Sequence, residues 1–230
     1  MKKFLNDMYA RASALNIKNI QGLLEPNPAA ALLDVGCDDG TLTLKLAKII
    51  GTSNISGVEI VPDQAEKAAR YNIKVKSFDL NDKFDWPDNT FDVVHANQVI
   101  EHLYNSDNFL SEIYRTLKPD GYAIISTENA SSWCNIFASV MGWQIFSLTN
   151  ISTKKRNIGN PLAIHRDEQP APPSWNHVRI YNWRGLKELL EAHSLIVEQA
   201  AGAGYFPLPA FLGNIDKIHA HFMTFKARKK

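Results

Sequence analysis

The sequence predicts an α/β fold in which a doubly wound, mostly parallel sheet is covered by helices on both faces. Short apolar runs rich in β-branched residues alternate along the chain with segments whose apolar residues have helical spacing. The composition supports a packed core, because 45% of the 230 residues are apolar and 21% are charged. Strands joined through helices form right-handed crossovers, so the expected sheet is parallel and buried on both sides.

The first half of the chain contains the clearest elements. The run AALLDVG at 30–36 ends in glycine and is followed by a leucine-rich helical pattern at 41–50. A second run at 55–60 leads into a helix that has Pro62 near its start. A later helix over 106–117, with Ser106 as its cap, ends at the turn KPDG. Three further strands are expected over 73–79, 91–97 and 122–127.

The second half divides into an insertion and a return to alternation. Between 128 and 178, tryptophan, serine, asparagine and proline are mixed and the alternation is lost, which predicts an inserted segment. From 179 to 230, a helix capped by Asn182, a strand over 194–202 and the run HAHFMTF complete the sheet domain begun by 30–127. The closing KARKK is expected to be a solvated tail. Residues 1–29 are expected to form one or two helices ending at the sequence PNP.

Charge and cysteine content exclude several classes of protein. Lys and Arg number 25 against 24 Asp and Glu, so no global field attracts nucleic acid, and basic residues gather only at 154–156 and in the tail. Cys37 and Cys134 lie far apart without metal-ligand spacing, which indicates a reducing compartment. No run approaches the roughly 20 apolar residues of a membrane span, and the basic start lacks a signal peptide's apolar stretch. We expect a cytoplasmic protein without a nucleic-acid partner.

The turn DVGCDDG after the first strand is the first candidate site, because ligands of open parallel sheets bind beyond the carboxyl ends of the strands. Gly36 and Gly40 let the backbone approach a ligand, and the following helix offers free N–H groups. A dinucleotide fingerprint needs glycine where Asp38 and Thr41 stand. The surrounding carboxylates would also repel a pyrophosphate, which argues against a nicotinamide-dependent oxidoreductase. These acidic residues are Asp34, Asp38 and Asp39.

The ligand of this turn is therefore expected to carry positive charge, as S-adenosylmethionine does in its sulfonium and ammonium groups. Two later acidic residues match the other parts of that molecule. Glu59 ends the second strand, close to the roughly 20-residue spacing at which a carboxylate accepts both ribose hydroxyls. Asp79 ends the third and can accept from the adenine amino group, while Leu80 offers its backbone N–H to the ring.

The ordered motifs LLDVGCDDG, VEI, FDLND, FDVVHANQVIEHL and RTLKPDGYAIIS, over about residues 30–127, resemble those of class I S-adenosylmethionine-dependent methyltransferases of small molecules. The later segment NWRGLKELLEAHSLIVEQAAG is similar to the family's last helix and strand. The resemblance implies a Rossmann-like, seven-stranded sheet whose last strand is antiparallel, a place that HFMTF fits. It also implies S-adenosyl-L-methionine as cofactor.

The resemblance assigns roles to individual residues of the cofactor site. Gly36, Asp38 and Gly40 would line the methionine moiety, with Asp38 standing where the family has its middle glycine. Asn97 and Gln98 would lie beneath the sulfonium. The expected cofactor-binding set is completed by Asp34, Cys37, Glu59, Ile60, Asp79 and Leu80.

The tract VIEHL follows the fourth strand, where the family often places groups that face the methyl acceptor. His102 is therefore the candidate general base, with His177 as a second candidate, and a purely structural role for His102 stays open. QVIEH also resembles the E-x-x-E-H motif of ubiquinone-pathway O-methyltransferases, in which two Glu and the His are linked to a divalent metal. Here Gln98 replaces the first Glu, and hard cations select charged oxygen ligands, so we expect no metal.

The expected function is in-line transfer of a methyl group to a small or amphiphilic acceptor. Segment 128–178 is expected to form a lid that selects an apolar acceptor, because its apolar residues recur at helical spacing; they include Trp133, Ile136, Phe137, Val140 and Met141. Packing of this stripe on the sheet or on a second subunit stays open. So do a non-catalytic S-adenosylmethionine-binding or regulatory protein of the same fold and an RNA methyltransferase. The sequence does not indicate the oligomeric state.

Overall fold

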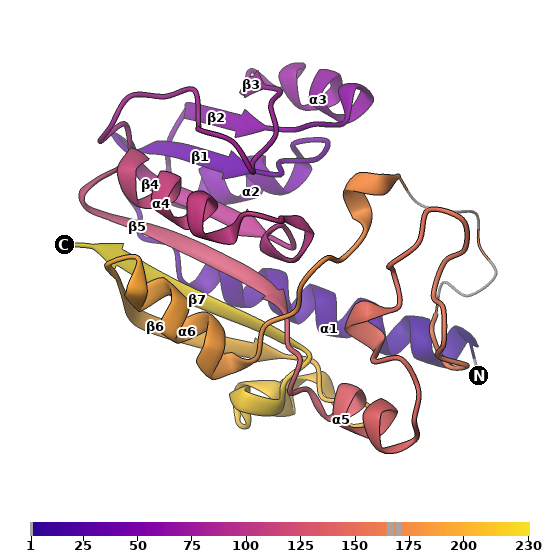
Figure 1. Ribbon diagram of the computed structural model, residues 1–230. Coiled ribbons are helices and arrows are strands. Elements are labelled where there is room, and N and C mark those ends of the chain that lie inside the picture. The colour runs from indigo at the N-terminus through magenta and orange to yellow at the C-terminus, as the bar shows by residue number, and fades with distance from the viewer. Residues whose placement is uncertain (1, 165–167, 169–171) are drawn as a thin grey trace.

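The computed structural model describes residues 2–164, 168 and 172–230, and it confirms the predicted fold class (Figure 1). The described chain forms one seven-stranded sheet in the order β3-β2-β1-β4-β5-β7-β6. Neighbouring strands are parallel except for β7, which runs antiparallel to both β5 and β6. The strands are β1 (Ala31–Val35), β2 (Asn54–Val58), β3 (Lys74–Lys76), β4 (Phe91–Asn97), β5 (Leu117–Glu128), β6 (Leu195–Ala203) and β7 (Phe222–Lys229).

Helices cover both faces of this sheet because each central strand is apolar on both sides. In β1, Leu32 packs with α1, α2 and α3, whereas the next residue, Leu33, packs with α4 and α6. Val93 and Val94 of β4 divide between the two faces in the same way. The helices are α1 (Lys2–Gly22), α2 (Thr41–Ile50), α3 (Pro62–Ala69), α4 (Ser106–Thr116), α5 (Trp133–Val140) and α6 (Trp183–Ala192).

A buried polar cluster fixes the position of α1 against the sheet. Asn16 of α1 is 3% exposed, and its amide nitrogen donates to Ser126 Oγ of β5 at 2.9 Å and to Asn97 Oδ1 of β4 at 3.2 Å. Its amide oxygen accepts from Thr224 Oγ1 of β7 at 2.9 Å. Because unpaired polar groups are costly in a core, these bonds define one register of α1 over the three strands.

Three details of the predicted elements are wrong or incomplete. Asn105, not Ser106, caps α4: its side chain accepts from Asn108 N at 3.2 Å, while the Ser106 hydroxyl accepts from Arg179. Strand β5 begins at Leu117, before the expected KPDG turn, because a bulge there lets Leu117 pair with β4. The N-terminal region forms one described helix, followed by a loop that contains the PNP sequence.

The prediction of a solvated C-terminal tail is also wrong, because β7 continues to Lys229 between two neighbouring strands. Lys226 is 1% exposed, its ammonium lies 4.3 Å from the centre of the Tyr122 ring, and it pairs with Glu25 at 2.5 Å. Arg228 pairs with Glu25 and with Glu198, each at 2.6 Å. These partners compensate the charges, so a basic run can lie inside the sheet.

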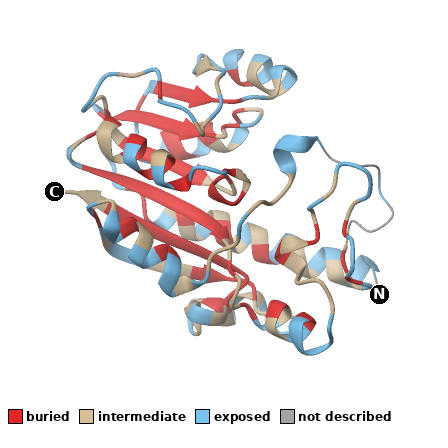
Figure 2. Ribbon diagram, viewed as in Figure 1, coloured by how far each residue is buried: buried red, intermediate tan, exposed pale blue. Residues whose placement is uncertain are grey.

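The inserted segment 128–178 leaves the sheet at the carboxyl end of β5 and extends toward the N-terminal end of α1 (Figure 1). It contains α5 and the short 3₁₀ turns η2 (Phe146–Leu148) and η3 (Pro173–Trp175), and much of it is exposed, in contrast to the buried strands (Figure 2). The division into 1–29, 30–127 with 179–230, and 128–178 stays a prediction. Among the described helices, none is both long and apolar enough to cross a membrane; the cytoplasmic location also stays a prediction.

Candidate active site

A cavity of about 750 Å³, which we call the strand-end cavity, lies beyond the carboxyl ends of β1, β2 and β4. Most of the predicted cofactor residues line it: Asp34, Gly36, Cys37, Asp38, Glu59, Ile60, Asp79, Leu80, Asn97 and Gln98. Gly40 is not among its lining residues. It begins α2 so close to α3 that a Cβ would lie 3.0 Å from the Ala68 Cα.

The turn after β1 has a left-handed backbone at Gly36, Asp38 and Gly40, with φ of +74°, +47° and +82°. A Cβ on Gly36 would lie 2.6 Å from a methyl group of Val99, so this position requires glycine. Aspartate is one of the few other residues that adopt the left-handed conformation. Asp38 therefore preserves the backbone path at the position where the resembling family has glycine.

Glu59 connects the end of β2 to this turn. Its Oε2 accepts from the backbone N–H of Asp38 at 3.0 Å, and its Oε1 accepts from that of Val61 at 2.8 Å. The side chain is largely buried yet lines the strand-end cavity. Because each carboxylate oxygen can accept a second hydrogen bond, Glu59 is held in place with acceptor capacity left for a ligand.

Asp34 and His95 form a buried pair across neighbouring strands β1 and β4, where they lie in register. Asp34 Oδ1 lies 2.7 Å from His95 Nδ1, and Oδ2 accepts from the Thr43 hydroxyl at 2.6 Å. The Asp34 carboxylate is thus occupied by internal partners. His95 Nε2 is buried without a hydrogen-bond partner in the described chain, and His95 lines the cavity, so it is a candidate ligand-binding group that the sequence reasoning missed.

Asn97 and Gln98 end β4 side by side. Asn97 Oδ1 is fixed by Asn16, as described above. Gln98 has a left-handed backbone, with φ of +56°, and its N–H donates to the carbonyl of Ser126 at 2.8 Å. Its amide Nε2 is buried, and no described residue accepts from it. A buried free donor beside the cavity is a group that a bound ligand would satisfy.

The adenine pair predicted from the sequence lies in the loop after β3. Asp79 Oδ1 accepts from the backbone and the side-chain nitrogen of Asn81, at 2.9 and 2.7 Å. Asp79 and Leu80 both line the strand-end cavity. The loop is therefore fixed by Asp79. The predicted strand 73–79 is too long, because β3 ends at Lys76 and Asp79 lies in the loop beyond it. The adenine-binding role of Asp79 and Leu80 stays a prediction.

The strand-end cavity is strongly acidic. Its described lining contains no Lys or Arg but six carboxylates: Asp34, Asp38, Asp39, Glu59, Asp79 and Glu128. Such a lining favours a cationic ligand and opposes a polyphosphate. The preference for a positively charged ligand, expected from the turn after β1, thus applies to the whole strand-end cavity.

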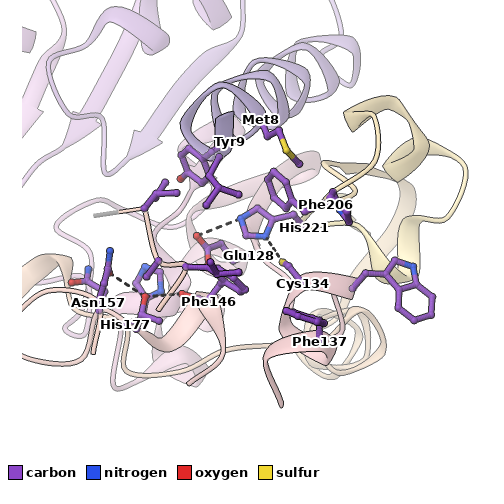
Figure 3. Close-up of a pocket in the computed structure, with 18 of the residues that line it drawn as sticks. Met8, Tyr9, Glu128, Cys134, Phe137, Phe146, Asn157, His177, Phe206 and His221 are labelled. Atoms are coloured by element: carbon purple, nitrogen blue, oxygen red, sulfur yellow. Dashed lines mark hydrogen bonds and ion pairs between the residues drawn. The ribbon is translucent and has the colours of Figure 1, made fainter. Parts of the chain in front are cut away.

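A second cavity, of about 580 Å³, lies between α1, α5 and the loops after η2 and β6; we call it the apolar cavity (Figure 3). Leu5 and Met8 contribute from α1, Phe137 from α5, Phe146 from η2 and Phe206 from the loop after β6. Trp133 of the predicted lid stripe also lines it, whereas Ile136, Val140 and Met141 do not. This cavity suits a ligand with an apolar body.

The two cavities share four residues: Tyr9, Glu128, Asn150 and His177. They come from α1, the end of β5 and two places in the inserted segment. Burial raises the pKa of Tyr9 well above its usual range, and the charges of Glu128 and Glu101 raise it further, so its hydroxyl is a neutral donor. A molecule in the apolar cavity therefore meets the strand-end cavity at a polar junction.

His102 and His177 lie at this junction with defined tautomers. His102 Nδ1 lies 3.0 Å from the carbonyl oxygen of Asn176, and His177 Nδ1 lies 2.6 Å from that of Ser147. Because a carbonyl only accepts, each Nδ1 carries a proton, and a neutral ring then has its lone pair on Nε2. The ring centres are 4.8 Å apart. Burial, reinforced by His177, lowers the pKa of His102 to about 4, so His102 is neutral at pH 7.

Glu101 adds a buried carboxylate behind the two histidines. It is 1% exposed, and neither oxygen has a hydrogen-bond partner among the residues described. Burial raises its pKa to about 7. One potential ligand atom from each of Glu101, His102 and His177 lies within 4.8 Å of the others. One carboxylate and two imidazoles are not the oxygen-rich donor set that magnesium selects. The expectation of no metal stays a prediction.

Comparison with known proteins shows the family to which the chain belongs. The family model described as "Methyltransferase domain" matches residues 7–200. The chain belongs to the S-adenosylmethionine-dependent methyltransferases. S-adenosylmethionine is accordingly the cofactor, and the acidic strand-end cavity fits its two cationic groups.

Among its relatives, this methyltransferase is 35% identical over 115 residues to an uncharacterized methyltransferase of Schizosaccharomyces pombe, covering 45% of this chain and 41% of that protein. It is 26% identical over 200 residues to the mitochondrial ubiquinone biosynthesis O-methyltransferase of Rattus norvegicus, covering 81% of this chain and 50% of that protein. The chain thus spans half or less of the length of these relatives. A possible histamine N-methyltransferase from Thermotoga maritima shares the fold, with a TM-score of 0.64, 17% identity and coverage of 100% and 97% of the two chains.

Several groups at the methyltransferase site were not singled out from the sequence. Tyr9 lies in a helix far from the motifs, Glu128 lies where the inserted segment begins, and His221, which lines the apolar cavity, belongs to the run HAHFMTF, from which only a strand was predicted. Glu101 and His102 are adjacent in the sequence VIEHL, so their proximity could be expected. His177 joins them only because the inserted segment folds back toward the end of β4. The sequence contained no signal for that contact.

We predict that Glu59→Ala weakens binding of S-adenosylhomocysteine by about 10- to 150-fold, because the change removes a charged acceptor for the ribose hydroxyls. Isothermal titration calorimetry measures the affinity. Asp63→Ala, an exposed carboxylate in the first turn of α3, is the control and should bind normally. Equal affinities of Glu59→Ala and the unchanged protein would move the ribose site elsewhere.

We also predict a pH-dependent contribution of His102 to stability. Its pKa falls from 6.5 to about 4 on folding, so the unfolded chain binds more protons between these pH values and stability decreases as pH falls through that window. Between pH 7 and pH 4.5, the free energy of unfolding of His102→Gln should therefore fall by about 2–3 kcal/mol less than that of the unchanged protein. Urea unfolding at both pH values measures this. Parallel curves for His102→Gln and the unchanged protein would contradict the prediction.

Proposed function

We propose that this methyltransferase transfers the methyl group of S-adenosylmethionine to a hydroxyl oxygen of a small acceptor with an apolar body. The observation that carries the proposal is the junction of the two cavities at Tyr9, Glu128, Asn150 and His177. The strand-end cavity holds the cofactor, and the apolar cavity is open to an acceptor that reaches the same four side chains. The name of the rat relative, an O-methyltransferase of ubiquinone biosynthesis, supports an oxygen acceptor.

The bound cofactor supplies an already activated methyl group, so the protein's main contribution is alignment in a water-poor site. Asn97 and Gln98 end β4 on the cofactor side of the junction. Tyr9, from the opposite side, can donate a hydrogen bond to the acceptor oxygen. These residues would hold the oxygen and the sulfonium in line.

His177 is better placed than His102 to accept the acceptor's proton. Its side chain lines both cavities, whereas His102 lines only the strand-end cavity. With Nδ1 bonded to Ser147, the Nε2 lone pair of His177 is the available acceptor. His102 packs against the His177 ring and would keep its orientation.

The alternatives that stay open at the sequence level receive less support from these observations. A non-catalytic binding protein does not require an apolar cavity that meets the cofactor at a histidine. An RNA methyltransferase is expected to place cationic side chains beside the cofactor site, but the described lining of the strand-end cavity has none.

The test is formation of S-adenosylhomocysteine from S-adenosylmethionine with 4-alkylcatechols of increasing chain length. kcat/KM should rise by up to about fourfold per buried CH₂ until the cavity is filled. His177→Ala should lower turnover by about 10² to 10⁴-fold with unchanged S-adenosylhomocysteine affinity, and His102→Ala should lower it less. If alkylamines are methylated and catechols are not, the proposal that the acceptor atom is oxygen is wrong. If His177→Ala has normal turnover, the proposal that His177 is the general base is wrong.

Phe137 and Met141 of the predicted lid stripe form a matched pair for the acceptor site. Both are about half exposed, but only Phe137 lines the apolar cavity. Phe137→Ala should raise the KM of the best alkylcatechol several-fold with unchanged cofactor affinity, whereas Met141→Ala should leave both unchanged. Steady-state kinetics measure the difference. If Phe137→Ala melts several degrees lower but keeps normal kinetics, the residue belongs to the core and not to the acceptor site.

A further inference from the structure

One wall of the apolar cavity carries a thiol, an imidazole and a carboxylate in a row (Figure 3). Cys134 Sγ, in the first turn of α5, lies 3.5 Å from His221 Nδ1. His221 Nε2 lies 3.9 Å from Glu128 Oε1, at the end of β5. The three residues come from distant parts of the chain, and the proposed methyl transfer uses neither Cys134 nor His221.

The position of His221 is fixed by its surroundings. Its ring packs edge-on against Phe206 and Phe222, with centres 4.9 and 4.5 Å apart, and its backbone N–H donates to Gly204. The residue is 4% exposed, and its Nε2 has no hydrogen-bond partner within the described chain. A buried, unpaired imidazole nitrogen beside a cavity points to a chemical or ligand-binding role.

At 3.5 Å, the Cys134 thiol and His221 Nδ1 are placed as a proton donor and a proton acceptor. Burial opposes the charge of Glu128, but His221 and His177 hold the pKa of this carboxyl below its ordinary value. Burial lowers the pKa of His221 and raises that of Cys134 to about 11. At neutral pH the row therefore consists of a thiol, a neutral ring and a carboxylate. The carboxylate beside Nε2 favours the tautomer with its proton there, which leaves the Nδ1 lone pair facing the thiol.

We propose that Cys134 is a covalent-modification site for apolar α,β-unsaturated carbonyl compounds that enter the apolar cavity. The Cys134 sulfur forms a bond to the β-carbon while His221 Nδ1 takes the thiol proton. The electron pair of the C=C bond moves to the α-carbon and carbonyl, and the resulting enolate takes that proton from His221. The product is a saturated thioether, and the imidazolium formed in between is stabilised by Glu128. No oxidant or reductant is needed.

Cys37 provides an internal comparison. It is 3% exposed and belongs to the strand-end cavity, where burial and the charges of Asp34 and Glu59 raise its pKa well above the usual range. Its sulfur lies 3.9 Å from the carbonyl oxygen of Asp38, whereas the sulfur of Cys134 faces an imidazole nitrogen that can accept its proton. The two free cysteines of the described chain are therefore expected to differ in reactivity toward the same reagent.

The consequence of the modification is selective. An adduct on Cys134 occupies the apolar cavity and leaves the strand-end cavity open. Binding of S-adenosylhomocysteine should persist, while any ligand of the apolar cavity is excluded. The site would thus let an electrophile switch off one of the two cavities. The labelling of Cys134 does not depend on the methyl acceptor, so its failure and that of the proposed function are distinguishable.

N-phenylmaleimide is the probe, with intact-mass measurement and peptide mapping of the native, full chain. We expect one adduct, on Cys134, formed at least tenfold faster than any adduct on Cys37. N-methylmaleimide, which lacks the apolar ring, should react more slowly. Calorimetry of the adduct should give an S-adenosylhomocysteine affinity within twofold of that of the unmodified protein.

Two variants test whether labelling of Cys134 depends on His221 as a base or only on the exposure of the thiol. His221→Gln should slow labelling of Cys134 about tenfold or more, whereas His219→Gln, whose imidazole pairs with Asp216 instead, should label normally. Circular dichroism melts confirm that each variant is folded under the labelling conditions. If His221→Gln unfolds, Glu128→Gln serves in its place. Equal labelling of Cys37 and Cys134, labelling only after unfolding, or a normal rate in the folded His221 or Glu128 variant would overturn the proposal.

Discussion

The buried side chain of Asn16 is the constraint on which the geometry of the site depends. It joins α1 to β4, β5 and β7 through Asn97, Ser126 and Thr224. One of these partners, Asn97, also lines the strand-end cavity, and two helical turns before Asn16 the same helix presents Tyr9 to both cavities. A single polar cluster thus fixes Tyr9, at the junction of the two cavities, relative to the strand ends, and its cost of burial is offset only when every bond forms.

The residues around the strand-end cavity were predictable because each belongs to a short, recognisable stretch of sequence. Each of its residues lies at a strand end or in the turn that follows, and β4 has the bounds that were predicted for it. Once the strands are parallel, their carboxyl ends meet at one edge, so Glu59 and Asp79 must come together with the turn after β1. The register of β1 against β4 goes further, since it pairs Asp34 with His95, but a register is not visible in one sequence.

The acceptor half could not be predicted because it depends on contacts between distant segments. Tyr9, Glu128 and His221 have no common motif, and only the folded chain brings them to one place. The prediction of a solvated C-terminal tail was wrong for a related reason. A run of basic residues normally indicates a solvated tail, but Lys226 meets Glu25 and the Tyr122 ring across about two hundred residues of sequence. A sequence pattern shows which side chains are charged, whereas the fold determines which partners compensate those charges.

The placement of β7 has a consequence for the order in which this protein is completed. The strand is the seventh in sequence order, yet it lies inside the sheet between β5 and β6. Before β7 is synthesised, the strand-end loops from β1 to β4 can already form from neighbouring segments, but β6 has no partner and His221 is not yet in place. Contacts of such long sequence separation form late. The strand-end loops therefore form before the wall that carries His221, and the growing chain exposes the open edge of β5 until β7 is synthesised.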